Sequence, residues 1–295
     1  MKKPIVIQAH EQSITDLIFT NDNKQLVSAS MDSAIRVWDT ATWAYKFELD
    51  GHVKSISKII EKKDDKLLIS TSRDGSIKFW DLEARKEILN LKGHKNAITA
   101  MAISPEETLL ATGSKTGEIK LWCLETMEEL ASVQTKSEPI LSLSFAENSS
   151  YLLVGKASSR MVSWSIPVMK KEKTIKTPFQ TINSLCHLAK GKKVLATGLG
   201  NSVGIWKTKD WSLESNIKLP AKTSYRCILA PNEKLVAVVY DHAVELRAVK
   251  TGALNKKLPF KVKGVNAAAF SEDSQFLAVG ASDKKIHIWN LEDLS

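Results

Sequence analysis

The stretch that determines the fold is KLLISTSRDGSIKFWDL, residues 66–82. It has the pattern of an apolar strand, a tight Arg-Asp-Gly-Ser turn and a second strand that ends in Trp80-Asp81. A similar outline recurs on both sides of this stretch, and one tryptophan marks most of the copies. Five of these tryptophans follow one another at intervals of 42 residues: Trp38, Trp80, Trp122, Trp164 and Trp206. Arg247 comes 41 residues after Trp206, and Trp289 another 42 residues on, so the chain contains seven similar units.

Each unit contains strand-like segments separated by short turns. In the first unit, residues 13–20, 25–31, 34–40 and 44–50 are rich in β-branched and aromatic residues. Connections of about four residues suit antiparallel neighbours and leave no room for the crossover helices of a TIM barrel. A repeat of about 40–45 residues with four strands is typical of a β-propeller. We therefore predict an all-β fold, a seven-bladed β-propeller of four-stranded antiparallel blades, in a single domain over residues 1–295.

The last unit has only three strand-like segments before the chain stops at Ser295. Residues 4–9, PIVIQA, precede the first unit and belong to no complete one. An unpaired strand edge promotes aggregation, and pairing of the two chain ends removes that edge. We expect the N-terminal strand, within residues 1–9, to complete the last blade and close the propeller.

Composition and charge narrow the function classes. The three cysteines (Cys123, Cys186 and Cys227) are widely spaced and form no CxxC pair, which favours a reducing compartment over a disulfide or zinc framework. Net charge is +9, with 19 Lys and Arg against 22 Asp and Glu in residues 1–147, but 23 against 11 in residues 148–295. An excess of basic residues in the second half is one sign of an acidic partner there. An ordinary solvated lysine surface is the alternative.

The N-terminal sequence MKKPIVIQA lacks the features of a secretory signal. Its apolar run is three residues long, whereas a signal peptide needs about 7–15. No apolar stretch approaches the roughly 20 residues of a membrane-spanning helix. We expect an intracellular protein, cytoplasmic or nuclear, with no membrane association.

These repeats resemble the WD-repeat β-propeller family along essentially the whole length of the chain. Trp-Asp stands at Trp38-Asp39 and Trp80-Asp81, and Gly-His stands at residues 51–52 and 93–94. The resemblance implies a His–Ser–Asp–Trp hydrogen-bond network that braces the blade, and two blades match it in full. The two sets of brace residues are His10, Ser28, Asp32, Trp38 and His52, Ser70, Asp74, Trp80. The choice of serine stays open, because Ser30 and Ser72 lie on the same segments.

The later units depart from this pattern. The third keeps His94 and Trp122 but has Thr116 where Asp is expected. The fourth and fifth lack both His and Asp, the sixth has Arg247 in place of Trp, and the seventh has no matching His. We expect blades 4–7 to be held more by apolar packing than by the brace.

A recurring Ser, His and Asp set also invites comparison with a hydrolase. The same spacing in two units suits a structural brace better than one catalytic site, and no G-x-S-x-G sequence presents a nucleophile. We therefore predict no enzyme activity, no catalytic residues, no metal or other cofactor and no small-molecule substrate.

The resemblance implies a scaffold whose top face and rim dock proteins or peptides. In the family, the residue before the turn Asp belongs to the ring around the channel mouth. Arg and Tyr are frequent interface anchors. The candidate partner-binding residues of the top face are Met31, Arg73, Lys115 and Tyr240.

A second candidate surface is basic. Lysines cluster after the third strand of unit 4 and in two connections of unit 5, which by the blade scheme open on the same, bottom face. The candidate basic patch is Lys170, Lys171, Lys173, Lys190, Lys192, Lys193, Lys207 and Lys209. Three alternatives stay open: a solvated surface, an acidic protein segment as partner, or nucleic acid.

Taken together, the sequence favours a non-catalytic protein–protein interaction scaffold, a WD-repeat subunit of a larger intracellular assembly. The alternative is a nucleic-acid-associated or ribonucleoprotein subunit that uses the basic surface of blades 4–6.

Overall fold

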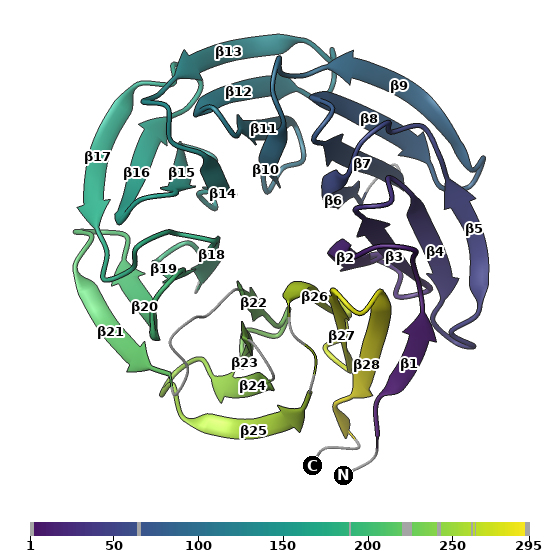
Figure 1. Ribbon diagram of the computed structural model, residues 1–295. Helices are drawn as coiled ribbons and strands as arrows, with labels where there is room; N and C mark the ends of the chain where they lie inside the picture. Colours follow the sequence, from purple (N-terminus) through teal and green to yellow (C-terminus); the bar gives the residue numbers. More distant parts are fainter. Residues whose placement is uncertain are drawn as a thin grey trace. The chain divides into compact units, whose positions relative to one another are not determined.

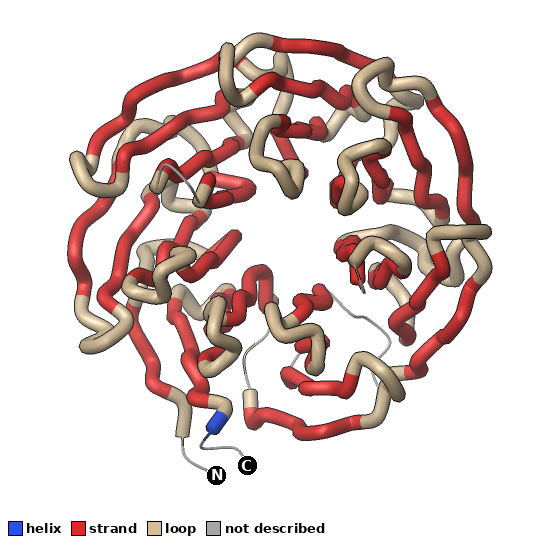
Figure 2. Tube along the Cα trace, turned by 180° about the vertical axis from the view of Figure 1, so that it is seen from behind, coloured by secondary structure: helices blue, strands red, loops and turns tan. Residues whose placement is uncertain are grey.

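The computed structural model describes residues 3–63, 66–188, 190–219, 226–240, 243–260, 262 and 264–292. Its regular elements are 28 strands in seven sheets, each a four-stranded antiparallel blade (Figure 1). Figure 2 shows strands joined by short loops throughout almost all of this part of the chain. The predicted fold class, all-β with seven four-stranded antiparallel blades, is confirmed.

The chain divides into two compact units, of which the first comprises Met1–Lys92 and Ile228–Ser295. Blade 1 consists of β2 (Ile14–Phe19), β3 (Gln25–Ser30), β4 (Ile35–Asp39) and β5 (Tyr45–Leu49). Blade 2 consists of β6 (Ile56–Lys62), β7 (Leu67–Ser72), β8 (Ser76–Asp81) and β9 (Lys86–Lys92). Blade 6 consists of β22 (Arg226–Leu229), β23 (Leu235–Tyr240), β24 (Ala243–Ala248) and β25 (Leu254–Pro259). Blade 7 consists of β26 (Val265–Phe270), β27 (Phe276–Ala281), β28 (Lys285–Asn290) and β1 (Ile5–Gln8).

The second unit, Gly93–Cys227, holds three blades. Blade 3 consists of β10 (Ile98–Ile103), β11 (Leu109–Ser114), β12 (Glu118–Cys123) and β13 (Glu129–Gln134). Blade 4 consists of β14 (Ile140–Phe145), β15 (Tyr151–Lys156), β16 (Arg160–Ser165) and β17 (Lys171–Lys176). Blade 5 consists of β18 (Ser184–Leu188), β19 (Lys193–Thr197), β20 (Ser202–Lys207) and β21 (Leu213–Lys218).

The N-terminal strand completes the last blade. β1 pairs antiparallel with β28, and the register places Ile5 opposite Ile288 and Ile7 opposite Ile286. The strand order of blade 7 is therefore β26-β27-β28-β1, with the first strand of the chain in the fourth position. The prediction that residues 1–9 supply the missing strand is confirmed.

A bulge lies near the start of the fourth strand in six of the blades. The register between third and fourth strands shifts at the position of the repeating tryptophan, for example between Val37 and Trp38 and between Phe79 and Trp80. The connection that follows contains a residue with positive φ, such as Trp43 at 59° and Trp211 at 61°. A bulge bends and twists a strand. The bulge therefore bends the fourth strand beside the repeating tryptophan, while the two strands stay paired on both sides of it.

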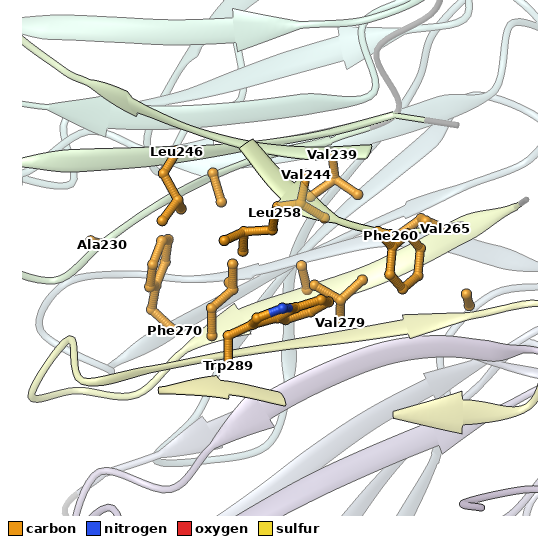
Figure 3. Packing of buried hydrophobic residues seen from close by; sticks show 14 residues of the cluster. Ala230, Val239, Val244, Leu246, Leu258, Phe260, Val265, Phe270, Val279 and Trp289 are labelled. Carbon is orange, nitrogen blue, oxygen red and sulfur yellow. The ribbon is translucent and has the colours of Figure 1, made fainter. Parts of the chain in front are cut away.

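Apolar side chains fill the space between neighbouring blades within each unit. Figure 3 shows Trp289 of β28 facing Leu258 and Val244 of blade 6, with Phe270 near Leu246. Phe260 packs edge-on against Trp289, with ring centroids 5.9 Å apart. Burial of one such side chain contributes about 1.5–3 kcal/mol to folding. These contacts hold neighbouring blades of one unit against each other.

Candidate functional site

Blade 1 contains a buried chain of hydrogen bonds that ends on Asp32. Trp38 Nε1 donates to Ser28 Oγ at 2.9 Å, and Ser28 Oγ lies 2.8 Å from His10 Nε2. His10 Nδ1 lies 3.1 Å from Asp32 Oδ2. Because the carboxylate can only accept, Nδ1 of the imidazole carries a proton and donates it to Asp32, and the serine oxygen accepts the indole N–H. The structure places Ser28, rather than Ser30, in this brace; Ser30 Oγ contacts the backbone oxygen of Ser13 at 3.0 Å.

Blade 2 repeats the arrangement with His52, Ser70, Asp74 and Trp80. The three links measure 2.8 Å from Trp80 to Ser70, 2.7 Å from Ser70 to His52 and 3.1 Å from His52 to Asp74. Burial alone raises the pKa of a carboxyl group. The hydrogen bond from histidine and the backbone N–H donors around each carboxylate outweigh burial and hold the pKa of Asp32 and of Asp74 well below 3.8. Both carboxylates are therefore charged at neutral pH.

Blade 3 keeps the brace with a different acid. His94 Nε2 lies 2.8 Å from Thr112 Oγ1, which accepts the indole N–H of Trp122 at 2.9 Å. Glu118 Oε2 lies 2.7 Å from His94 Nδ1 and takes the place of the missing aspartate. Burial lowers the pKa of His94, and Glu118 offsets that effect in part. Sequence comparison of equivalent positions missed Glu118 because it stands two residues after Thr116, on the next strand.

Blade 6 has an ionic core in place of the tryptophan. Glu245 is 2% exposed and accepts hydrogen bonds from Arg247 at 2.7 and 2.9 Å and from the hydroxyl of Tyr240. Arg247 also donates to the backbone oxygen of Gly252 at 2.8 Å. Burial and the adjacent carboxylate raise the pKa of Tyr240. The prediction of Tyr240 as a surface anchor is therefore wrong, because its ring is 4% exposed and its hydroxyl is used inside the blade.

The remaining blades pack their tryptophans without a His–Asp brace. Among the described residues, the indole N–H groups of Trp164 and Trp289 have no hydrogen-bond partner. In blade 5, the ring of Trp206 lies directly against Gly204, where a Cβ atom would come within 2.2 Å of it. In blade 7, Asp283 pairs with His287 at 2.9 Å, and the His287 ring stacks on Trp289. Aromatic and apolar contacts thus replace the polar network in these blades.

The other three top-face candidates lie on equivalent turns between second and third strands. Arg73 and Lys115 are exposed, and Met31 is half-buried. In each turn, the backbone N–H of the candidate residue donates to a backbone oxygen just before the first strand of the same blade. The N–H groups of Met31, Arg73 and Lys115 donate to the oxygens of Ser13, Ser55 and Ala97, each at 2.9 Å. Met31 and Arg73 belong to neighbouring blades of the first unit, and Lys115 belongs to the second unit.

The structure brings together five of the eight basic candidates. The five line one groove between blades 4 and 5, and we call this groove the lysine groove: Lys190, Lys192, Lys193, Lys207 and Lys209. The other three are also exposed but are not among the residues that line the groove: Lys170 directly precedes β17, and Lys171 and Lys173 belong to it. Sequence reasoning missed the opposite wall, which residues Ala146–Tyr151 of blade 4 supply.

Within the described ranges, no three or more His, Cys, Asp and Glu side chains come together as metal ligands would. The same part of the chain contains no helix with the length and apolar character of a membrane span.

The repeats were compared with known families and proteins. The family model described as "WD domain, G-beta repeat" matches residues 1–39, 43–81, 85–123 and 254–290, more than half of the chain. A comparison with curated proteins found no match. The first three matched segments end at or just after Trp38, Trp80 and Trp122, the tryptophans of the three braced blades. The chain therefore belongs to the WD40 repeat family.

Proposed function

We propose that this protein is a non-catalytic scaffold for protein–protein interaction and a subunit of a larger intracellular assembly. WD40 propellers in general bind other proteins. The observation that carries the proposal is Arg73, an exposed arginine on a turn whose backbone is fixed. Its N–H bonds Ser55 O at 2.9 Å, and the next residue, Asp74, is held by His52. A turn whose backbone is already fixed loses little backbone entropy when a partner binds, and arginine is a frequent anchor of interfaces.

The polar residues of the brace support the non-catalytic part of this proposal. The His10 side chain is 0% exposed, and Ser28 is likewise 0% exposed. Ser28 Oγ also already contacts both the imidazole and the indole. A hydroxyl enclosed in this way has no path to a substrate carbonyl, although its partners are those of a catalytic triad.

The test is affinity capture of the tagged protein from its own cells, with and without nuclease, followed by identification of the partners. We expect at least one partner that resists nuclease, is lost with Arg73→Glu and is retained with Arg85→Glu. Arg85 is an exposed arginine on the connection after β8 in the same blade, so the two variants change charge equally. A partner released by nuclease and unaffected by Arg73→Glu would instead favour the nucleic-acid-associated subunit that uses the basic surface of blades 4–6.

A further inference from the structure

The lysine groove is formed by connections at the bottom end of two neighbouring blades. One wall is the β14–β15 connection of blade 4, and the other consists of the β18–β19 hairpin and the residues that follow β20 in blade 5. Its volume is about 710 Å³, within the range of roughly 300–1,000 Å³ typical of binding pockets. Four of its lysines are exposed, and Lys193 is half-buried.

The positive charge in the groove exceeds what its surroundings neutralise. Five lysines line it, and Glu147 is the one acidic residue among the lining residues. Among the described residues, Lys193 alone of the five has a carboxylate within ion-pair distance, Glu214 at 2.7 Å. Lys193 and Lys207 are also direct cross-strand neighbours, a placement that is unfavourable for two like charges.

The fold does not require these lysines, because the same chain builds an equivalent groove without them. Three repeats earlier, between blades 1 and 2, a groove is lined by Asp22, Glu61 and Glu83 together with Lys46, Lys63, Lys66 and Arg85. Lys66 pairs there with Glu83 at 2.5 Å, and Glu61 accepts the backbone N–H of Asn21 at 2.6 Å.

The two grooves also differ in charge at equivalent positions of their repeats. The sequence has Asp64, Asp81 and Glu83 at the positions that correspond in blade 5 to Lys190, Lys207 and Lys209. Three acids in one repeat are thus three lysines in the other. The charge of the lysine groove is a property of this site and not of the repeat.

Two hydrogen bonds join the two segments of the blade 5 wall. Thr208 N donates to Lys192 O at 3.0 Å, and Thr208 Oγ1 donates to Gly191 O at 2.9 Å. Gly191 has φ of +76°, and a Cβ atom there would come within 2.8 Å of Glu147 Cβ. Glycine therefore lets the blade 5 hairpin approach the blade 4 wall. A groove that is already formed costs a ligand little ordering.

We propose that the lysine groove binds an extended acidic segment of a partner protein, rich in aspartate and glutamate. This inference rests on the scaffold function proposed above and names the chemistry of one partner. Ammonium groups are compact point charges, and several of them along a groove match carboxylates spaced along a peptide. Nucleic acid fits less well: the one aromatic residue that lines the groove is Tyr151, whose hydroxyl contacts His187 and whose ring meets Trp211 edge-on. Tyr151 is half-buried, and binding of single-stranded nucleic acid typically uses several aromatic side chains on which successive bases stack.

The experiment measures binding of a fluorescein-labelled octaglutamate peptide to the purified full chain by fluorescence anisotropy at low salt. The test variant is Lys192→Gln/Lys207→Gln/Lys209→Gln. The matched control is Lys170→Gln/Lys171→Gln/Lys173→Gln, which removes the same charge from exposed lysines outside the groove lining. Thermal unfolding shows whether both variants remain folded. A labelled single-stranded RNA octamer is measured in parallel.

We expect the test variant to weaken octaglutamate binding about tenfold and the control to weaken it less than about twofold. Binding should also weaken as salt rises, because surface charges are screened. Equal losses of affinity in the two variants would show that only the net charge of the protein matters, and they would overturn the proposal. So would the absence of peptide binding, or tighter binding of the RNA octamer that the test variant abolishes. Arg73 is unchanged in both variants, so these outcomes are separate from failure of the capture experiment.

Discussion

Glu118 Oε2 lies 2.7 Å from His94 Nδ1, where Asp32 and Asp74 contact the corresponding histidines of blades 1 and 2. The glutamate stands two residues further along the chain than those aspartates, at the start of β12. The glutamate side chain is one methylene group longer than that of aspartate, and this length lets its carboxylate reach the imidazole from the start of β12. Blade 3 thus keeps the complete brace although its sequence lacks the expected acid.

Replacement of Glu118 by alanine should destabilise the protein by about 1–3 kcal/mol, because the buried His94 Nδ1–H loses its acceptor. Adding Thr116→Asp should recover part of the loss, since this position carries the aspartate in blades 1 and 2. Urea unfolding measures the effect. Glu128→Ala, an exposed site of the same blade, is the control and should change stability by less than about 0.5 kcal/mol. Equal effects of Glu118→Ala and Glu128→Ala would contradict the assigned role.

The charged braces should make stability fall in acid. The folded-state pKa of Asp32 and of Asp74 lies below the ordinary value of 3.8, so their ionisation stabilises the fold above that pH. This contribution is lost as pH falls from about 4 towards the lower folded-state pKa. Melting temperatures from pH 6 to pH 3 test the effect. Asp32→Asn/Asp74→Asn should be less stable at pH 6 and show a flatter decline; a slope as steep as that of the unmodified protein would refute the assignment.

Burial of His187 should make the stability of the fold depend on pH in a second, higher range. It lies between Ser144 Oγ at 2.8 Å and the Tyr151 hydroxyl at 3.1 Å, and burial lowers its pKa from 6.5 to about 4. The unfolded chain binds a proton below about pH 6.5, whereas the folded chain does so only near pH 4. Stability should therefore fall across this window by at most about 3 kcal/mol. His187→Gln should remove the dependence between pH 6.5 and 4 in urea titrations. Titration of the His187 ring near pH 6.5 by NMR would disprove it.

Deletion of residues 4–9 should lower the melting temperature and promote aggregation. It removes β1, and with it the pairing that covers the edge of β28 from Lys285 to Ile288. Thermal unfolding and light scattering measure the two effects. Deletion of residues 1–3, which precede the strand, is the control and should leave both measurements near the values of the full chain. An unchanged melting temperature after loss of residues 4–9 would show that the pairing contributes little.

Gly204→Ala should destabilise blade 5 by about 1–3 kcal/mol, because the added methyl group overlaps the buried ring of Trp206. Gly200→Ala provides the comparison, since its nearest contact would be Phe179 at 3.5 Å, an ordinary separation. Urea unfolding of the two variants measures and compares their free energies of unfolding. If both alanines have similar effects, the contact between Gly204 and Trp206 is not a determinant of packing in this blade.

Predictions from local pattern agree with the structure where the cause is local. The 42-residue interval of the tryptophans and the turn residues between strands indicate seven blades, and the strand-like residues 4–9 indicate a partner for β28. Alternation of side chains along a strand and the φ preferences of turns depend on neighbours in the chain, so they can be read without coordinates. Tyr240 shows the limit of this reasoning, because equivalence to exposed turn residues did not reveal the buried Glu245 beside it.

The sequence by itself determined the number of blades, their antiparallel pairing and the His, Asp and Trp positions of two braces, since these features repeat at fixed intervals along the chain. Only the tertiary structure decided that Glu118 serves His94, that Tyr240 lies inside blade 6 and that five lysines share one groove with the β14–β15 connection. The physical reason is that these features depend on side-chain reach and on loops of neighbouring blades meeting in space. Neither feature produces a repeating pattern in the sequence.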